Sequence, residues 1–193
     1  MGAFRLRNAR GFTFVEVFIS GIILAIMAVA VLELLTRQSD FFEVSTTAGE
    51  LRTDAERAVG DIARELRLAT RDTPGVAPSI TVPAAPGNTA VTFFVPQDVD
   101  GQNGVLDAIG DVEWDATNPI QFQYDAAARQ LRRVEGAAVR VVANDVEAVT
   151  FEDRAIDNSL YNDEVKVNLT LSRTTPHRRT VAETASTVVR LRN

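Results

Sequence analysis

Residues 12–35 read FTFVEVFISGIILAIMAVAVLELL, and this stretch decides the fold. It is apolar on every face of a helix except at Glu16, Ser20, Gly21 and Glu33. At a rise of about 1.5 Å per residue, a helix of this length crosses a hydrocarbon core of roughly 30 Å. The stretch therefore predicts a helix that leaves water and inserts in a membrane.

The two acids in this stretch differ in position. Glu16 lies near the start, where an ionised carboxylate in an apolar helix costs several kcal/mol and by default requires a partner and a function. Glu33 lies at the far end and precedes the polar residues 36–40, so its carboxylate can reach the interface. We therefore expect Glu16 to be functional and Glu33 to be a solvated boundary residue.

Charge is segregated along the chain. Residues 1–11 contain Arg5, Arg7 and Arg10 and no acid, and removing these three charges from the total of −6 leaves −9 on the remainder. A basic leader before an apolar run stays in the cytoplasm, so the remainder is sent across the membrane. An acidic remainder also argues against nucleic acid as a partner, because phosphate binding needs clusters of Lys and Arg.

A secretory signal peptide is one alternative for residues 1–35, but it fits poorly. Its apolar region normally has about 7 to 15 residues and ends at a small-residue cleavage site. Here the small residue, Gly11, precedes the apolar run. Any cleavage is therefore expected before the helix, which stays attached to the product.

Residues 5–17 read RLRNARGFTFVEV: a basic segment, a Gly, an aromatic residue, a Thr, and an acid five places after the Gly. Followed by the apolar run, this motif resembles the N-terminal signature of type IV prepilins and type II secretion pseudopilins. The resemblance implies cleavage by a prepilin peptidase between Gly11 and Phe12, methylation of the Phe12 amine, and a family-defining acid at Glu16. It also implies assembly with other pilins or pseudopilins by an inner-membrane platform. A plain N-terminal membrane anchor is the alternative.

Cleavage after Gly11 and an acid at Glu16 together allow an ion pair at the helix start. Cleavage after Gly11 creates a charged amine on Phe12 at the start of the helix, where unpaired N–H groups already carry partial positive charge. Glu16 lies one turn further and pairs either with the amine of its own chain or with that of a neighbouring subunit. In a medium of low dielectric an ion pair recovers much of the cost of an unpaired charge, so a neighbour's amine fixes the register of stacked helices.

Residues 36–73 continue the helix as an amphipathic segment. Apolar residues recur at spacings of three and four, at Val44, Ala48, Leu51, Ala55, Val59, Ile62, Leu66 and Ala69. Opposite charges occupy neighbouring helical positions at Arg52 and Glu56, Arg57 and Asp61, and Asp61 and Arg64. We expect the helix to extend to residue 70, ahead of Pro74, and its apolar stripe to pack on the domain that follows.

Residues 74–193 form the predicted globular domain. Residues 74–88 hold four of the seven prolines and are predicted to be a linker. The apolar period then becomes two, which predicts strands at 90–95, 120–124, 129–134, 139–143, 146–152, 165–172 and 186–192. Residues 120–134 are predicted to form a hairpin around 125–128. One helix followed by strands with short links predicts an α+β fold with an antiparallel sheet against the helix.

The long amphipathic helix, the hairpin and the strand-rich C-terminal region resemble minor pilins and the larger minor pseudopilins, which initiate filaments or lie at their tips. Many major pilins carry a helix-kinking Pro and a C-terminal disulfide, whereas this chain has no Pro from Phe12 to Thr73 and no Cys. The resemblance implies a single-pass inner-membrane protein with a cytoplasmic N-terminus and a periplasmic domain. That protein then joins a type IV pilus or a type II secretion pseudopilus.

A calcium loop is suggested by Asp98, Asp100, Asn103 and Asp107, because hard cations bind several carboxylate and carbonyl oxygens in a Gly-containing turn. Some relatives in the pilin family bind calcium in their globular domains. The spacing departs from the EF-hand pattern, since Ile109 stands at the twelfth position, where an acid is required. We predict a solvated acidic turn and no metal, with calcium as the alternative.

The sequence carries no residue pattern typical of an enzyme, so we predict no catalytic site and no cofactor. The single histidine, His177, is expected in an exposed turn, and neither a nucleophile motif nor a phosphate loop accompanies it. Trp114 is expected to pack over a sheet edge rather than to anchor a partner. The basic pairs at 132–133 and 178–179 are expected to be solvated.

These observations predict a minor pilin or pseudopilin subunit that acts by assembly and not by catalysis. Two other classes compete with this prediction. A membrane-anchored binding module that never assembles would retain residues 1–11. A periplasmic enzyme with an N-terminal anchor would show activity in a fragment starting near Pro74.

Overall fold

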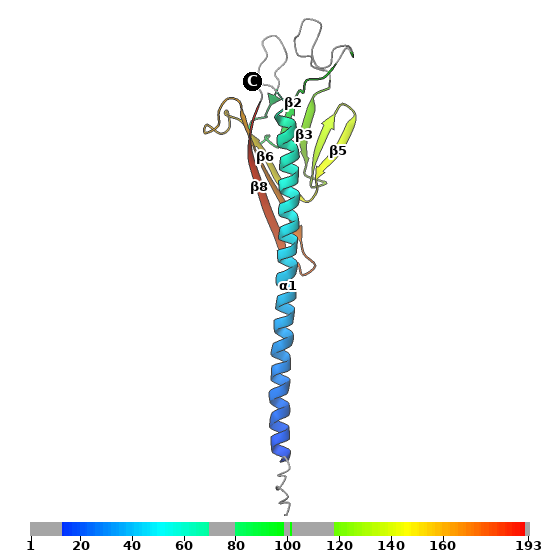
Figure 1. The fold of residues 1–193 in the computed structure, drawn as a ribbon, viewed down its shortest axis with the longest axis vertical. Helices are drawn as coiled ribbons and strands as arrows, with labels where there is room; N and C mark the ends of the chain where they lie inside the picture. Colours follow the sequence, from blue (N-terminus) through cyan, green and yellow to red (C-terminus); the bar gives the residue numbers. More distant parts are fainter. Residues whose placement is uncertain (1–12, 70–79, 99–100, 102–117, 192–193) are drawn as a thin grey trace, which may run out of the picture. The chain divides into compact units, whose positions relative to one another are not determined.

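The computed structural model describes residues 13–69, 80–98, 101 and 118–191. Over these ranges the protein is α+β, as predicted: one long helix, α1 (Phe14–Leu66), precedes eight strands in antiparallel pairing (Figure 1). The chain divides into two compact units, Met1–Glu43 and Val44–Asn193. The first contains the N-terminal part of α1, and the second contains its C-terminal part and the strands.

The C-terminal part of α1 is amphipathic, and its apolar stripe contacts the strands. The eight residues of the predicted stripe are buried or pack half-buried against the core: Val44, Ala48, Leu51, Ala55, Val59, Ile62, Leu66 and Ala69. On its other faces Arg52 pairs with Glu56 (2.9 Å), and Asp61 pairs with Arg64 (3.1 Å) and not with Arg57. These exposed pairs stabilise the helix by only a few tenths of a kcal/mol each.

Helix α1 ends at Leu66, four residues before the predicted end at residue 70. Its last turn tightens, because the backbone N–H groups of Leu68 and Ala69 donate to carbonyls three residues back, at 3.0 and 3.1 Å. Such bonds commonly close the C-terminus of an α-helix. This turn ends the helix before Pro74, the residue on which the prediction depended.

Five strands form one antiparallel sheet in the order β1-β2-β3-β4-β5. Their bounds are β1 (Ile80–Thr81), β2 (Ala90–Phe93), β3 (Ile120–Asp125), β4 (Gln130–Glu135) and β5 (Ala138–Ala143). The predicted hairpin over 120–134 is confirmed as β3 and β4, and the Asp125 carboxylate closes its turn by accepting from the N–H of Ala128 (3.0 Å). Strand β1 was missed because its two residues lie within the Pro-rich segment.

The remaining strands, β6 (Val146–Glu152), β7 (Glu164–Thr174) and β8 (Thr180–Arg190), form a second antiparallel sheet in that order. The sequence predicted one sheet, and the division occurs at the two-residue link between β5 and β6. Asp145 in this link has a φ of +58°. Its carbonyl accepts a hydrogen bond from the N–H of Ser172 in β7 (2.8 Å), so the chain turns away from β5 and pairs with β7.

Strand β8 begins six residues before the predicted start at residue 186. Residues 180–185 (TVAETA) contain one β-branched apolar side chain, Val181, and three residues of types that are depleted in strands, Ala182, Glu183 and Ala185, so their apolar strand pattern is weak. They are held as a strand by register with β7, in which Thr180 pairs with Thr174 and Ala185 with Leu169.

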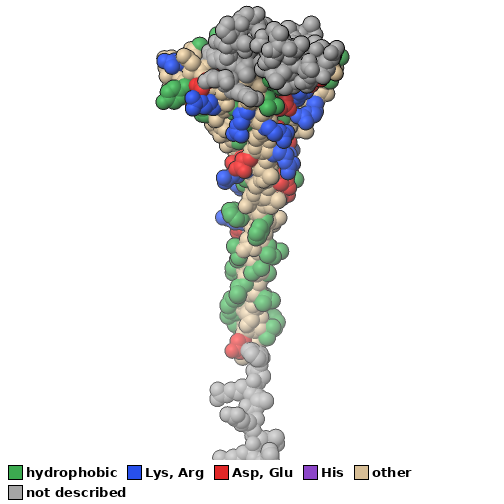
Figure 2. Space-filling model, turned by 45° about the horizontal axis from the view of Figure 1, so that its top comes forward, with side chains coloured by type: hydrophobic (Ala, Val, Ile, Leu, Met, Phe, Trp, Pro, Cys, Tyr) green, Lys and Arg blue, Asp and Glu red, His purple; other side chains and the backbone are tan. Residues whose placement is uncertain are grey.

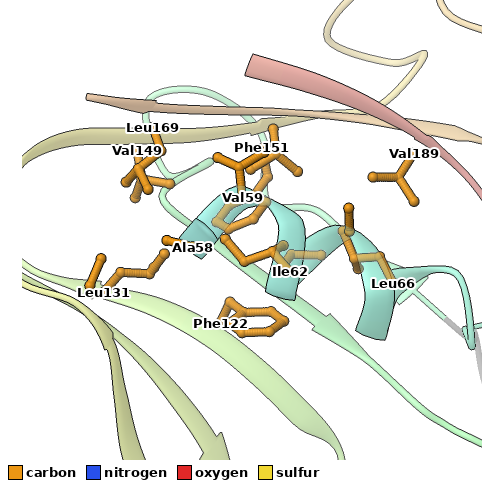
Figure 3. Packing of buried hydrophobic residues seen from close by; sticks show 14 of the residues in the cluster. Ala58, Val59, Ile62, Leu66, Phe122, Leu131, Val149, Phe151, Leu169 and Val189 are labelled. Carbon is orange, nitrogen blue, oxygen red and sulfur yellow. The ribbon is translucent and has the colours of Figure 1, made fainter. Parts of the chain in front are cut away.

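The core lies where α1 meets both sheets. Figure 3 shows Ala58, Val59, Ile62 and Leu66 of α1 between side chains of the two sheets. Phe122 and Leu131 come from the first sheet, and Val149, Phe151, Leu169 and Val189 from the second. These residues belong to one buried cluster, and Ile62, Phe122 and Phe151 are fully buried. The helix stripe therefore joins the two sheets into one core.

Arg133 is not solvated, contrary to the prediction. Its side chain is 19% exposed, and its guanidinium contacts Glu65 of α1 and Glu135 of β4, each at 2.6 Å. Burial lowers the pKa of Arg133, but hydrogen bonds to the two carboxylates outweigh burial and raise that pKa above its usual value. Neighbouring strand residues point to opposite faces, so Arg133 faces α1 whereas Arg132 pairs with Asp125 at 2.7 Å. The pair at 178–179 is exposed, as predicted.

Candidate functional site: the apolar part of helix α1

The N-terminal part of α1, residues 14–35, exposes apolar side chains in every direction. Figure 2 shows hydrophobic side chains gathered along this part of the helix. The following residues are between 47% and 85% exposed: Phe14, Val15, Val17, Phe18, Ile19, Ile22, Ile23, Leu24, Ile26, Met27, Val29, Val31, Leu32, Leu34 and Leu35. Among the described residues, α1 is the one helix long and apolar enough to cross a membrane, and its most apolar segment is 0% buried. The predicted candidate membrane span is therefore present.

Thr13 and Glu16 form a reciprocal cap at the start of α1. The Thr13 hydroxyl accepts a hydrogen bond from the backbone N–H of Glu16 (3.3 Å), and the Glu16 carboxylate accepts from the backbone N–H of Thr13 (3.3 Å). The same carboxylate oxygen lies 3.4 Å from the Thr13 hydroxyl, which donates to it. This arrangement is a capping box, in which a Thr and an acid three residues later satisfy two backbone donors at a helix end.

This role of Thr13 was not predicted, although the sequence contains a signal for it. The pattern T-x-x-E directly before an apolar run is the sequence signature of a capping box. The charge of Glu16 predicts a cation as its partner, whereas the structure gives it backbone donors of its own helix start. Glu16 thus has a partner within its own chain that neither predicted pairing included.

The capping box orients the Glu16 carboxylate but does not neutralise its charge. The first turn of a helix favours an acid through its partial positive charge, and the Thr13 N–H adds one hydrogen bond. Neutral donors alone still leave an ionised carboxylate costly in a medium of low dielectric, whereas a cation recovers more of that cost. The capping box can therefore orient the Glu16 carboxylate at the helix start without a cation bound to it.

Gly11 and Phe12, the predicted cleavage and methylation residues, lie outside the described residues. Their roles stay predictions, and so does the pairing of Glu16 with the Phe12 amine of its own chain or of a neighbour. The capping box uses only Thr13 and Glu16, which both lie on the C-terminal side of the predicted cleavage point. Cleavage after Gly11 would therefore leave its atoms in place.

A groove lies over Gly21 in the apolar segment. It is lined by Phe14, Val17, Phe18, Ile22 and Ala25, and the rings of Phe14 and Phe18 stack with centroids 6.5 Å apart. A Cβ placed on Gly21 would meet nothing within 4 Å. Small residues on apolar helices allow the backbone of a second helix to approach closely, so this groove is suited to helix packing in lipid or in a bundle.

The apolar segment ends at an ion pair on the helix surface. Arg37 contacts Glu33 at 2.6 Å, and both side chains are more than 60% exposed, as expected for a boundary residue at Glu33. The Thr36 hydroxyl donates to the carbonyls of Leu32 (3.2 Å) and Glu33 (2.9 Å). Polar side chains here are satisfied by the helix itself, which suits the edge of a hydrocarbon layer.

The other predicted sites lie only partly within the described residues. Asp98 accepts a hydrogen bond from the N–H of Gly101 (2.6 Å), whereas Asp100, Asn103, Asp107 and Trp114 lie outside the described residues. Within the described ranges, no group of three or more His, Asp or Glu side chains is arranged to hold a metal ion. His177 is exposed in the turn between β7 and β8, as predicted.

Comparisons with the models of known protein families, with curated proteins and with solved structures found no match to this chain.

Proposed function

We propose that the chain is a minor pilin or minor pseudopilin, a subunit of a type IV pilus or a type II secretion pseudopilus. Residues 12–35 anchor it in the inner membrane with its globular domain in the periplasm. A prepilin peptidase cuts between Gly11 and Phe12, and an inner-membrane platform then moves the subunit into the filament. The observation that carries the proposal is an exposed apolar helix that starts with an acid, directly after a basic leader and a Gly.

The change of surroundings explains why the acid matters. Moving the helix from lipid into a bundle of apolar helices replaces one apolar neighbour by another, so burial of apolar area provides little driving force. A charge pair between Glu16 and the Phe12 amine of a neighbouring subunit forms only in the bundle, and its geometry depends on the axial offset of the two helices. The pair therefore sets the register, and the Thr13 cap positions the carboxylate beforehand.

Three variants of the full chain separate charge from capping. Glu16→Gln keeps an acceptor for the capping box, because Gln also serves at this position, but removes the charge. Thr13→Ala removes the hydroxyl half of the capping box and keeps both the charge and the backbone N–H that donates to Glu16. Glu16→Ala removes the charge and the carboxylate half of the box. Each variant is expressed in its native cell, and sheared filaments and membranes are blotted for the subunit.

Glu16→Gln and Glu16→Ala are expected in the membrane fraction but absent from filaments, whereas Thr13→Ala is expected in both. Assembly of Glu16→Gln at the native level would contradict a role for the charge. Loss of Thr13→Ala from filaments with normal assembly of Glu16→Gln would make Glu16 a capping residue and nothing more.

A membrane-anchored binding module that never assembles is the second candidate. The capping box favours this candidate in one respect, because Glu16 then stabilises the start of its own helix and requires no neighbouring subunit. For this candidate, all three variants stay in the membrane and sheared material contains neither the native chain nor any variant.

A further inference from the structure

Two exposed aromatic residues follow the apolar segment on α1. Phe41 and Phe42 are 70% and 67% exposed, and their rings are 6.3 Å apart at an interplanar angle of 70°. They stand within a polar stretch, between TRQSD at 36–40 and STT at 45–47. Both belong to the unit that ends at Glu43, and neither contributes to the hydrophobic core of the globular domain.

Exposure of this pair to water is unfavourable, since each Phe carries about 150 to 250 Å² of mainly apolar surface. The two rings are neighbours, with centroids 6.3 Å apart, and form one exposed apolar patch. The apolar segment just before them is exposed on all faces and needs an apolar medium around it. A medium that surrounds the helix at this level covers the patch as well.

The position of the pair along the axis fits the polar layer of a bilayer. The apolar segment ends at Leu35, and Phe41 and Phe42 lie six and seven residues beyond it, or about 9 and 10 Å along the axis. Side chains of a helix tilt toward its N-terminus, so both rings reach back toward the apolar segment. The headgroup layer on each side of the hydrocarbon core is about 5 to 8 Å thick. Trp and Tyr gather at this level, and Phe residues of helices that lie in the plane of the interface insert there.

We propose that Phe41 and Phe42 are an interfacial anchor that inserts among phospholipid headgroups and fixes the depth of α1 in the membrane. The inference rests on the membrane insertion contained in the proposed function, but it does not require filament assembly. The partner is a phospholipid surface on the side of the globular domain. A second subunit covering the rings is the competing occupant.

The test uses single-tryptophan variants of the full chain in dilute phospholipid vesicles. Trp114→Phe provides the background, and one tryptophan is added as Phe42→Trp, Val29→Trp or Arg57→Trp. Val29 lies inside the apolar segment, six residues or about 9 Å before its end at Leu35, and Arg57 is an exposed position within the globular unit. Fluorescence is measured with lipids brominated near the headgroup, with lipids brominated deep in the acyl chain, and with a water-soluble quencher.

We expect Phe42→Trp to lose most fluorescence with lipids brominated near the headgroup, and Val29→Trp with lipids brominated deep in the chain. Arg57→Trp should respond mainly to the water-soluble quencher. The anchor is wrong if Phe42→Trp is as accessible to that quencher as Arg57→Trp. It is also wrong if Phe42→Trp is shielded only at high protein density, because a second subunit then covers the ring.

The controls separate this inference from the proposed function. If lipids do not quench Val29→Trp, membrane insertion itself fails. If they quench Val29→Trp but not Phe42→Trp, only the anchor fails. Should Trp114→Phe impair folding, the tryptophans are added to the native chain and the signal of Trp114 is subtracted.

Discussion

The two parts of α1 have one backbone conformation and opposite surroundings. From Phe14 to Leu35 the helix is apolar on all faces and its large side chains are exposed, whereas from Leu51 to Leu66 one stripe is buried and the other faces carry charge. An apolar stripe has a partner inside the molecule, here two sheets. Apolarity on every face indicates a partner outside the molecule, a lipid layer or other helices.

The acidic side chains of the two parts of α1 also differ in the partners that they contact. In the first part Glu16 is held by its own helix start, and Glu33 by Arg37 on the same surface. In the second part Glu65 reaches across to Arg133 of β4. Charges near the apolar segment are thus satisfied locally, while charges beside the core connect different elements.

Substitution of the buried stripe should have the largest effect on stability. Ile62→Ala removes a fully buried side chain between the two sheets and should lower the free energy of unfolding by about 2 to 5 kcal/mol. Ile26→Ala, at a residue 64% exposed in the apolar segment, is the matched control and should leave it nearly unchanged. Urea unfolding of the full chain in detergent measures both. If both variants lower the free energy of unfolding equally, the two parts of the helix do not differ in their contribution to stability.

Breaking the link between α1 and β4 should have the next largest effect. Glu65→Gln removes the charge that faces the guanidinium of Arg133, whose side chain is 19% exposed, and should cost about 1 to 3 kcal/mol. Glu56→Gln breaks the exposed pair with Arg52 and should cost a few tenths of a kcal/mol. If the two variants unfold at the same urea concentration, burial does not strengthen the Glu65 pair.

Loss of the capping box should act locally. Thr13→Ala should destabilise the first turn of α1 by about 1 kcal/mol, without changing the unfolding of the globular domain. Amide hydrogen exchange in detergent should therefore speed up at the first residues of the helix and stay constant at Leu51 to Leu66. Thr53→Ala, an exposed mid-helix control, should not affect exchange at the start. Unchanged exchange after Thr13→Ala would show that the cap contributes nothing.

The smallest effect should be an acid dependence in the loop between β6 and β7. Hydrogen bonds from the Ser159 hydroxyl and N–H, then from Lys166, lower the pKa of Asp157 to about 2. A carboxylate with a lowered pKa stabilises the fold above its usual pKa, and this contribution disappears as pH falls toward 2. Asp157→Asn should therefore reduce the difference in urea midpoint between about pH 5 and about pH 2. An unchanged difference in this variant would assign the acid dependence to other carboxylates.

Much of the fold could be predicted because it depends on local periodicity. The stripe from Val44 to Ala69 and the β3–β4 hairpin follow from spacing and alternation. The second sheet could not be predicted, because it depends on the positive φ of Asp145 and on the pairing of Ser172, which are properties of tertiary contact.

The candidate site was predictable in part. The exposed apolar segment follows directly from composition. The cap at Thr13 has a sequence signal of its own, the pattern T-x-x-E before an apolar run, although it was not predicted. The side chain of Arg133 points toward α1 because of the face of β4 on which it lies. The sequence alone did not predict which face of this strand packs on the helix. Cleavage after Gly11 is a property of a peptidase as well as of this chain, so it stays a prediction until the mature protein is measured.

The most direct test of the account is the intact mass of the native protein, extracted from its own membranes, together with fragmentation of its N-terminus. The account predicts a chain that begins at Phe12 with a methylated amine and retains the whole of α1. A native protein that still carries residues 1–11 would contradict it, because no charged amine would then exist beside Glu16.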